Sequence, residues 1–276
     1  MGISRDFFHL HLVSDSTGET LRTVARAVGA QYETSQPVEH VYPMIRAARQ
    51  LERVLIELEN APGIVLYTLV DPELSMTLER RCLEVGIPCV NVLDPVLQVF
   101  QSYLNVPFAR RIGGQHTLDA EYFDRIEALN FTMAHDDGQL PEDLEAANVI
   151  LVGISRTSKT PTCIYLANRG IKAINYPIVP EIPIPKRLFA VKKPLVVGLV
   201  ATAERIVQIR QNRLLALNAA DENSSYVDRR LVSDEVIYTR RLCAEQGWPL
   251  IDVTRRSIEE TAAEIIALLN ERRFKR

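Results

Sequence analysis

The feature that most constrains the fold of this chain is an apolar run that leads into a loop of phosphate-binding type. Residues 149–152 are apolar without interruption and mostly β-branched, which is typical of a buried strand in a parallel sheet. The next eight residues, 153–160, read G-I-S-R-T-S-K-T, and residues 162–167 can continue as a helix. Strand, loop and helix in this order indicate a nucleotide-binding α/β unit.

Each residue type in the loop suits phosphate binding. Gly153 permits a tight turn, after which successive backbone N–H groups can point at phosphate oxygens. Lys159 can neutralise the β- or terminal phosphate, and the hydroxyl of Thr160 can hold Mg²⁺. The pattern G-x-x-x-x-G-K-[ST] has a second glycine where this chain has Ser158, and a serine fits there if its backbone angles are ordinary. The predicted nucleotide-binding residues are Gly153, Ile154, Ser155, Arg156, Thr157, Ser158, Lys159 and Thr160.

A second interpretation of the loop needs no ligand. A glycine followed by polar residues between a strand and a helix can be a simple turn with a good cap, with Lys159 as a solvated cation. Pro161 bears only weakly on the choice, because proline is tolerated in the first turn of a helix.

Length and periodicity predict an α/β fold with two lobes. At 276 residues the chain exceeds a typical domain of about 100 to 200 residues, and 47% hydrophobic residues suffice for a large core. Strands are predicted at 7–13, 38–42, 63–70, 87–92, 149–152, 171–175, 195–200 and 250–253, and helices at 20–32, 45–59, 72–85, 95–104, 119–134, 162–167, 203–217, 228–246 and 258–270. The prolines from Pro177 to Pro185 are expected to exclude regular structure. We expect an amino-terminal doubly wound parallel-sheet lobe at 1–106, a connector with a bridging helix at 107–146, and a carboxyl-terminal P-loop kinase-like lobe at 147–276.

Charge and apolar content exclude several classes of protein. A net charge of -3 provides no basic field for nucleic acid, and no apolar run approaches the roughly 18 residues that span a bilayer. The first residues lack a hydrophobic signal region, so we expect a cytoplasmic protein without membrane association. The four cysteines have neither C-x-x-C spacing nor a histidine arrangement, which favours reduced thiols over disulfides or zinc.

A second candidate phosphate site follows the first predicted strand. Asp15, Ser16 and Thr17 stand between a strand and a helix, where free N–H groups and the helix dipole favour anions. The same segment has the S-x-x-E spacing of a capping box in Ser16 and Glu19, which would explain both residues without a ligand. Both interpretations stay open.

Adjacent carboxylates form a third candidate. Asp136 and Asp137 can bind Mg²⁺ or accept a proton from a hydroxyl nucleophile, or they can form a solvated turn before Gly138. The strand at 195–200 ends without the expected metal-binding aspartate, for which Asp252 is the nearest substitute. Two further sets of residues have candidate roles. Arg205, Arg210 and Arg213 could face phosphate or be solvated, and His9, His11, His40 and His116 are expected to be structural.

Four segments together resemble one protein family over nearly the full chain. Residues 153–161, G-I-S-R-T-S-K-T-P, are similar to the nucleotide loop of the bifunctional regulatory proteins of pyruvate, phosphate dikinase and of phosphoenolpyruvate synthase. Residues 14–20 (S-D-S-T-G-E-T), 122–128 (Y-F-D-R-I-E-A) leading to 135–138 (H-D-D-G), and 175–177 (N-Y-P) agree in order and spacing. The synthase branch tends to carry C-G-K-T in the loop and the dikinase branch T-S-K-T, so residues 157–160 favour the dikinase branch.

The resemblance implies two phosphoryl transfers on one protein substrate, the dikinase. One transfers the β-phosphoryl of ADP to a threonine, and the other uses inorganic phosphate to remove it, releasing pyrophosphate. It implies that Lys159 contacts the transferring phosphate, Thr160 holds Mg²⁺ and Arg156 stabilises transition-state charge, with Asp136 and Asp137 as further catalytic candidates and the 15–17 turn at the protein substrate. A P-loop kinase of a small metabolite and a non-catalytic nucleotide switch stay open, as does a dimeric state; the absence of N-K-x-D disfavours a GTPase.

Overall fold

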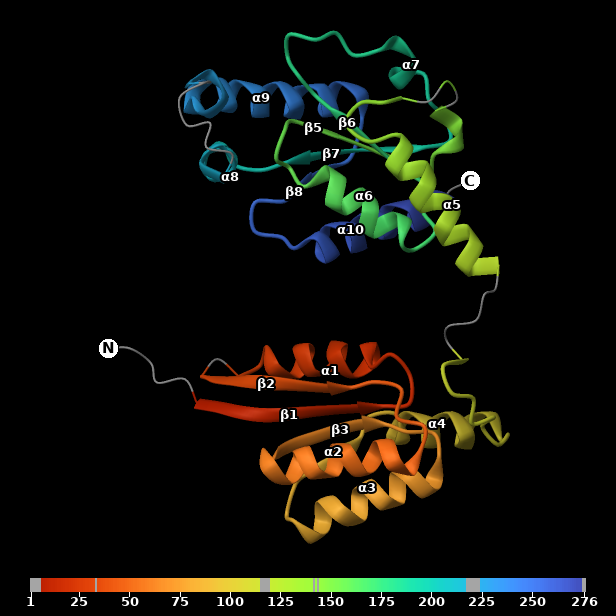
Figure 1. The fold of residues 1–276 in the computed structure, drawn as a ribbon. Helices are drawn as coiled ribbons and strands as arrows, with labels where there is room; N and C mark the ends of the chain where they lie inside the picture. The colour runs from red at the N-terminus through yellow and green to blue at the C-terminus, as the bar shows by residue number, and fades with distance from the viewer. Residues whose placement is uncertain are drawn as a thin grey trace. The chain divides into compact units, whose positions relative to one another are not determined.

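The structure is a computed structural model that describes residues 6–32, 34–114, 120–140, 142, 144–216 and 224–274. The chain divides into two compact units, Met1–Thr117 and Leu118–Arg276 (Figure 1). Each unit is built around its own parallel sheet, and each is described by itself.

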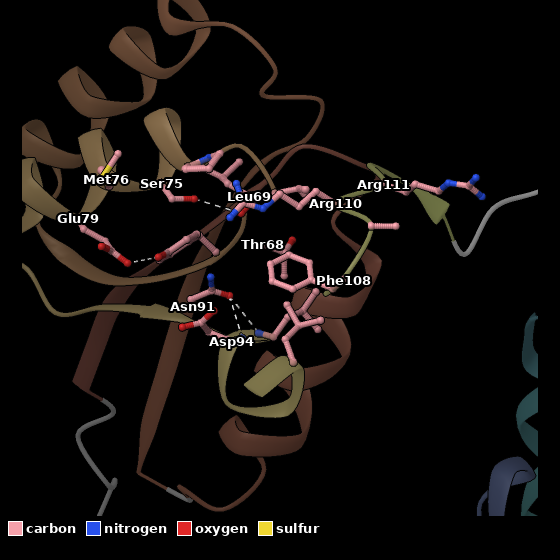
Figure 2. A pocket seen from close by; sticks show the side chains of 16 residues that line it. Thr68, Leu69, Ser75, Met76, Glu79, Asn91, Asp94, Phe108, Arg110 and Arg111 are labelled. Carbon is pink, nitrogen blue, oxygen red and sulfur yellow. Dashed lines mark hydrogen bonds between the residues drawn. The ribbon is translucent and has the colours of Figure 1, made fainter. Parts of the chain in front are cut away.

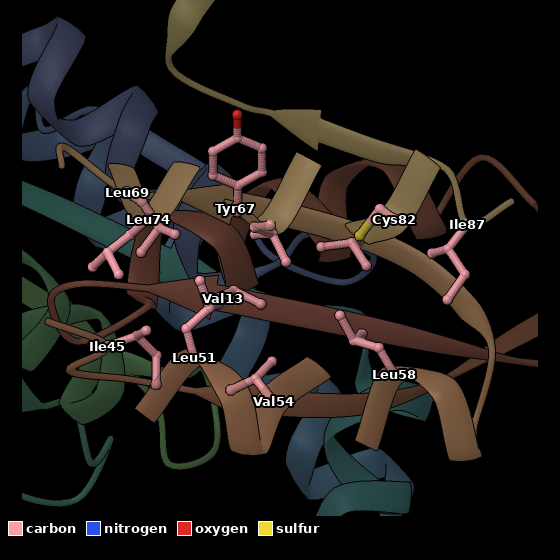
Figure 3. Packing of buried hydrophobic residues seen from close by; sticks show 12 residues of the cluster. Val13, Ile45, Leu51, Val54, Leu58, Tyr67, Leu69, Leu74, Cys82 and Ile87 are labelled. Atoms are coloured by element: carbon pink, nitrogen blue, oxygen red, sulfur yellow. The ribbon is translucent and has the colours of Figure 1, made fainter. Parts of the chain in front are cut away.

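The first unit is a four-stranded parallel sheet in the order β2-β1-β3-β4. Its elements are β1 (Asp6–Ser14), α1 (Glu19–Gly29), β2 (Ser35–Tyr42), α2 (Ala48–Asn60), β3 (Gly63–Thr68), α3 (Pro72–Glu84), β4 (Cys89–Asn91) and α4 (Asp94–Leu104). Both faces of the sheet are covered. Val13 and Tyr67 pack with α2 and α3 on one face (Figure 3). Leu12 packs with α1 on the other face.

Three histidines lie on the first two strands of this sheet. Nδ1 of His9 lies 2.9 Å from Nε2 of His40, and His11 contacts the Tyr42 hydroxyl at 3.1 Å and the Ala61 carbonyl at 2.8 Å. Burial, with the nearby charges of His40 and His9, lowers the pKa of His11 despite the hydrogen bond to Ala61. These contacts are all internal to the unit; the remaining predicted structural histidine, at position 116, lies outside the described residues.

The second unit is also a four-stranded parallel sheet, in the order β6-β5-β7-β8. Its elements are α5 (Ala120–Ala134), η2 (Leu144–Ala146), β5 (Val149–Gly153), α6 (Lys159–Ala167), β6 (Ala173–Pro177), α7 (Lys186–Phe189), β7 (Leu195–Val200), α8 (Ala203–Ala216), η3 (Ser224–Val227), α9 (Arg229–Gln246), β8 (Leu250–Asp252) and α10 (Ile258–Phe274). Alternate residues of β5 enter opposite cores: Val152 packs with α9, and Leu151 packs with α6 and α10.

The two sheets have the same strand order. In each, the first strand lies between the second and the third, and the fourth follows the third. This order places a topological switch between the first and third strands, at whose carboxyl ends parallel α/β proteins bind ligands. The predicted α/β class with parallel sheets is confirmed, and the loops singled out in the sequence follow the first strand of each sheet.

The proline-rich stretch differs from its prediction. Pro177 is the last residue of β6, so the expected exclusion of regular structure was wrong at that position. Residues 178–185 contain no helix or strand, as predicted, and the short helix α7 (Lys186–Phe189) begins directly after them. Because β6 is an edge strand, it has no neighbouring strand on its outer side. The N–H that proline lacks is therefore not needed for strand pairing on that side.

Candidate active site

The loop after β5 is closely packed against the neighbouring strand. A Cβ atom on Gly153 would lie 2.4 Å from the Leu199 carbonyl oxygen and 3.1 Å from Oγ1 of Thr157, so only glycine fits at the end of β5. Ile154 is fully buried. The loop therefore turns directly from the centre of the sheet into α6.

Two non-glycine residues of this loop have left-handed backbone conformations. Arg156 has φ 75° and Ser158 has φ 58°. Ser158 is the N-cap of α6, but its side chain makes no capping hydrogen bond. The condition of ordinary backbone angles is not met at Ser158: the serine adopts a conformation that favours glycine, at a cost of about 1 to 3 kcal/mol. Such strain is typical of ligand-binding loops.

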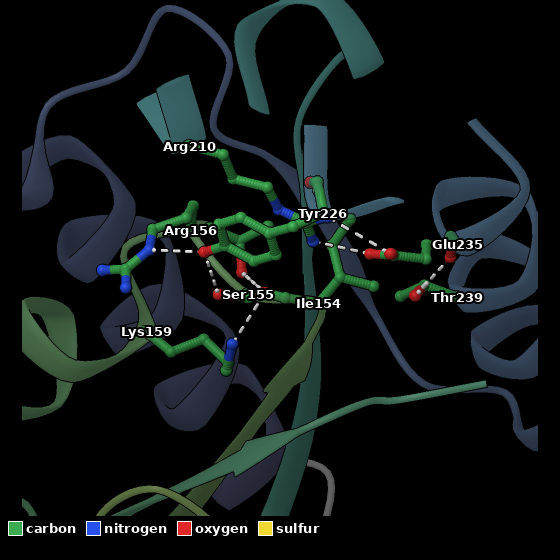
Figure 4. A network of polar contacts seen from close by, with 9 residues as sticks. Ile154, Ser155, Arg156, Lys159, Arg210, Tyr226, Glu235 and Thr239 are labelled. Atoms are coloured by element: carbon green, nitrogen blue, oxygen red, sulfur yellow. Dashed lines mark hydrogen bonds and ion pairs between the residues drawn. The ribbon is translucent and has the colours of Figure 1, made fainter. Parts of the chain in front are cut away.

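Lys159 is folded into the loop. Its side chain is only 6% exposed, and Nζ donates a hydrogen bond of 2.8 Å to the Ile154 carbonyl oxygen. The same oxygen accepts a bond of 2.9 Å from the Thr157 hydroxyl (Figure 4 shows the lysine). Burial lowers the pKa of Lys159 to about 8, although Asp137 and Asp136 act in the opposite direction. An anion at the loop would give the ammonium a stronger partner than a carbonyl.

Thr160 meets two polar side chains from other elements. Its hydroxyl donates to Oδ1 of Asp136 at 3.2 Å and accepts from Nδ2 of Asn175 at 2.9 Å. Nδ2 of Asn175 also donates to Oδ1 of Asp136 at 2.6 Å. Asn175 is buried, and its Oδ1 has no hydrogen-bond partner within the described ranges. The structure thus brings hydroxyl and carboxylate oxygens together at the start of α6, and Mg²⁺ prefers oxygen ligands of these kinds.

The second aspartate of the pair has a different environment. Asp137 is exposed and has φ 54°, whereas the next residue, Gly138, donates its N–H to the Asn175 carbonyl oxygen at 3.0 Å. No group of three or more His, Cys, Asp or Glu side chains in the described part of the chain could hold a metal. A Mg²⁺ ion here would therefore depend on substrate phosphates and water for most of its ligands.

The substitute aspartate and two of the three arginines have polar partners. Asp252 accepts hydrogen bonds from Arg240 at 3.0 Å and from the Thr254 hydroxyl at 2.5 Å, and its role as a metal ligand stays a prediction. Arg210 is buried in an ion pair with Glu235 at 2.6 Å rather than turned toward phosphate, and Arg205 is exposed and bonds Gln208. Arg213 is exposed as well.

The turn after β1 holds its aspartate firmly. Oδ2 of Asp15 accepts a hydrogen bond of 2.7 Å from the Val70 N–H, and its carbonyl oxygen accepts one of 2.8 Å from Nε of Arg46. Burial raises the pKa of Asp15, although the bond from Val70 and the charge of Arg46 oppose the shift. The side chain of Asp15 thus braces the ends of β1 and β3.

The capping-box interpretation of this turn is wrong. The N-cap of α1 is Gly18, with φ 80° and no side-chain capping bond, and Glu19 is the first helical residue. Ser16 is therefore not a cap. Thr17 is exposed and Ser16 half-buried, so their hydroxyls can meet a ligand.

A cavity of about 470 Å³ opens at the carboxyl ends of β3 and β4 in the first unit. Thr68 and Asn91 line it from the strands, and Phe108, Arg110 and Arg111 line it from the segment after α4 (Figure 2). The guanidinium of Arg110 lies 5.4 Å from the centre of the Phe108 ring. The sequence predicted only a connector there, and gave no sign that this segment lines a cavity.

Comparison with known proteins shows the family of the chain. A family model described as kinase/pyrophosphorylase matches residues 10–266. The chain belongs to this family. It is 59% identical over 264 residues to a protein of Agrobacterium fabrum, and the match covers 96% of this chain and 97% of the relative. It is 58% identical over 276 residues to a protein of Bradyrhizobium sp. strain ORS 278, and that match covers 100% of this chain and 99% of the relative. A protein of Rhodopseudomonas palustris strain BisA53 is 60% identical over 270 residues. All three bear the name putative pyruvate, phosphate dikinase regulatory protein.

In this member of the kinase/pyrophosphorylase family, two residues at the loop were not predicted from the chemistry of the sequence. Asn175 was noted only for its resemblance, and Tyr226, whose hydroxyl contacts Ser155 and Arg156, was not noted at all. Tyr226 lies 70 positions from Arg156, and no local pattern marks it.

None of the helices in the described ranges combines the length and apolar content needed to cross a bilayer.

Proposed function

We propose that this protein is a bifunctional regulator of pyruvate, phosphate dikinase that adds a phosphoryl group to a threonine of that enzyme and also removes it. The observation that carries the proposal is the loop after β5, where Lys159 is folded inward and Thr160 is hydrogen-bonded to Asp136. The family membership and the names of the relatives support the kind of reaction and the target.

Both proposed reactions are phosphoryl transfers between oxygens. In the kinase direction the threonine hydroxyl attacks the β-phosphorus of ADP, the bond to the α-phosphate oxygen breaks, AMP leaves, and the hydroxyl proton is released. In the other direction inorganic phosphate attacks the phosphothreonine, pyrophosphate leaves, and the threonine oxygen takes up a proton. One site can serve both, since ADP and phosphate can occupy overlapping positions and catalysis is mainly positioning and charge neutralisation.

The loop residues divide this work. We assign the backbone N–H groups from Gly153 to Ser158 to the α- and β-phosphates and Lys159 to the phosphoryl group in transfer. Arg156 stabilises charge that develops in the transition state. The exposed carboxylate of Asp137, near Lys159, is the candidate for accepting the threonine proton.

The residues at the start of α6 fit a Mg²⁺ ion. The buried Oδ1 of Asn175 is unpartnered in the described structure, and the Thr160 hydroxyl and Asp136 carboxylate lie beside the same amide. We assign Thr160 and Asp136 to the ion and Asn175 to holding them in place. Bound there, Mg²⁺ would neutralise part of the charge on the nucleotide phosphates.

The turn of the first unit has a proposed role in handling the protein substrate. Asp15 is fixed by Val70, and the hydroxyls of Ser16 and Thr17 stand at the carboxyl end of β1, where parallel sheets bind ligands. We assign these hydroxyls to the acceptor segment of the dikinase.

The decisive experiment combines the purified protein with active dikinase. Addition of ADP should produce AMP and inactive dikinase in equal amounts, and later addition of phosphate should produce pyrophosphate and restore activity. Nucleotide turnover without dikinase would instead indicate a metabolite kinase, and ADP binding without AMP formation a switch protein. Turnover with phosphoenolpyruvate synthase alone would move the protein to the other branch.

A further inference from the structure

Tyr226 connects the nucleotide loop to the two helices that follow β7. It belongs to η3, between α8 and α9, and its hydroxyl lies 3.3 Å from Oγ of Ser155. Nε of Arg156 donates a hydrogen bond of 3.2 Å to the same hydroxyl. Figure 4 shows Tyr226 between Arg156 and Arg210.

Arg210 contacts both the backbone and the ring of Tyr226 and holds this residue in place. Its side chain is 2% exposed, and its two terminal nitrogens bond both carboxylate oxygens of Glu235, at 3.2 and 2.6 Å. One of these nitrogens also donates to the backbone oxygen of Tyr226 at 2.9 Å, and the guanidinium carbon lies 4.5 Å from the centre of the tyrosine ring. A bidentate pair whose arginine is buried has little conformational freedom, so both the backbone and the ring of Tyr226 are held.

An apolar cluster joins the same elements beneath the loop. Ile154 packs with Ile206 of α8 and with Val232 and Val236 of α9, and all four are buried. The loop, α8 and α9 therefore form one packed structure, against which a side chain of the loop can be oriented.

Arg156 has the geometry of a side chain that is held for a ligand. Its backbone is left-handed, and the bond to Tyr226 uses Nε, while its terminal nitrogens have no partner within the described residues. Those nitrogens are the part of a guanidinium that forms paired bonds with phosphate oxygens.

We propose that Tyr226 is a positioning residue, whose hydroxyl orients Arg156 so that its terminal nitrogens meet the phosphoryl group in transfer. The inference rests on the proposed function, since it presumes that Arg156 acts on that group. Because Tyr226 acts through Arg156, its removal should slow transfer more than it weakens nucleotide binding.

The test is Tyr226→Phe, which keeps the ring against Arg210 and removes only the hydroxyl. We expect kcat to fall about tenfold in both directions, the scale of one lost hydrogen bond to a charged group, with the ADP dissociation constant within about twofold of wild type. The matched control is Tyr238→Phe, a tyrosine of α9 that lines the same surface cavity as Tyr226 and makes no described contact with the loop. Its kcat should not change.

A double-mutant cycle separates positioning from a general structural effect. In an Arg156→Ala background, Tyr226→Phe should cause no further loss of kcat. An unchanged kcat in the single variant, or an equal loss in both backgrounds, would overturn the inference alone. Failure of the wild-type protein to form AMP with dikinase and ADP would overturn the proposed function, and the inference with it.

Discussion

Lys159 combines a buried position with a charge that the proposed reaction needs. Its pKa is lowered from 10.5 to about 8, so at every pH below 8 the folded protein carries the cost of burying the charge. That cost disappears as the pH rises from 8 to 10.5, where the unfolded chain alone still binds the proton. At neutral pH the buried charge of Lys159 therefore lowers the free energy of unfolding.

Lys159→Met should abolish both reactions and leave the fold intact or stabilised. We expect kcat to fall at least a hundredfold, since a transition-state charge contact is lost. At pH 7 the free energy of unfolding should rise by up to about 3 kcal/mol, at about 1.4 kcal/mol per pKa unit. Activity assays and urea unfolding measure both, with the exposed Lys186→Met as control. Near-normal activity in either direction would contradict a single shared site.

Ser158 also combines an unfavourable conformation with a position in the proposed nucleotide-binding loop. Because its φ is 58°, Ser158→Gly should keep ADP affinity within a few-fold and leave stability unchanged or slightly higher. Ser158→Val should lower the free energy of unfolding by about 1 to 3 kcal/mol, as a β-branched residue is poorly tolerated there. Calorimetric titration with ADP and thermal unfolding decide. Loss of ADP binding in the glycine variant would show instead that the hydroxyl is a ligand.

At the scale of elements, substitutions in the β1–α1 turn can distinguish a role in ligand binding from a role in helix capping. Since Gly18 is the N-cap and has no side chain, replacing both Ser16 and Thr17 by Ala should leave the melting temperature nearly unchanged. The variant should raise the KM for dikinase severalfold without changing ADP affinity. Thr23→Ala, which removes an exposed hydroxyl on α1, is the control. Normal dikinase kinetics in the double variant would remove this turn from the proposed site.

The β1–β2 pair should make the first unit sensitive to acid. The pKa of His11 is lowered by burial and by repulsion from His40 and His9, with Glu57 acting in the opposite direction. As the pH falls through about 6.5, the unfolded chain therefore binds a proton that the folded unit still excludes, and the free energy of unfolding falls. Urea unfolding between pH 7.5 and 5.5 should show this fall, and His11→Phe should reduce it. An equal fall in both proteins would assign the effect to other groups.

At the scale of the whole molecule, the chain contains two units with the same strand order. Each has its candidate loop after the first strand: the turn after β1 with Asp15, and the loop after β5 with Lys159. The order of strands was not visible in the sequence, because it depends on how each helix crosses the sheet rather than on the pattern within any segment. The two units therefore share their strand order but no recognisable repeat in the amino-acid sequence.

The sequence by itself determined the types of the main elements and the α/β class, and it predicted phosphate binding by residues 153–160. These follow from periodicity and from local motifs, which depend on neighbouring residues alone. Only the tertiary structure decided that Asp136 rather than Asp252 meets Thr160, that Ser158 is left-handed, and that Tyr226 contacts Arg156. The aspartate and tyrosine contacts join residues 24 and 70 positions apart, and such pairs are set by strand order and helix packing. The angle at Ser158 is set by the closure of the loop between β5 and α6, which overrides the local preference of a serine.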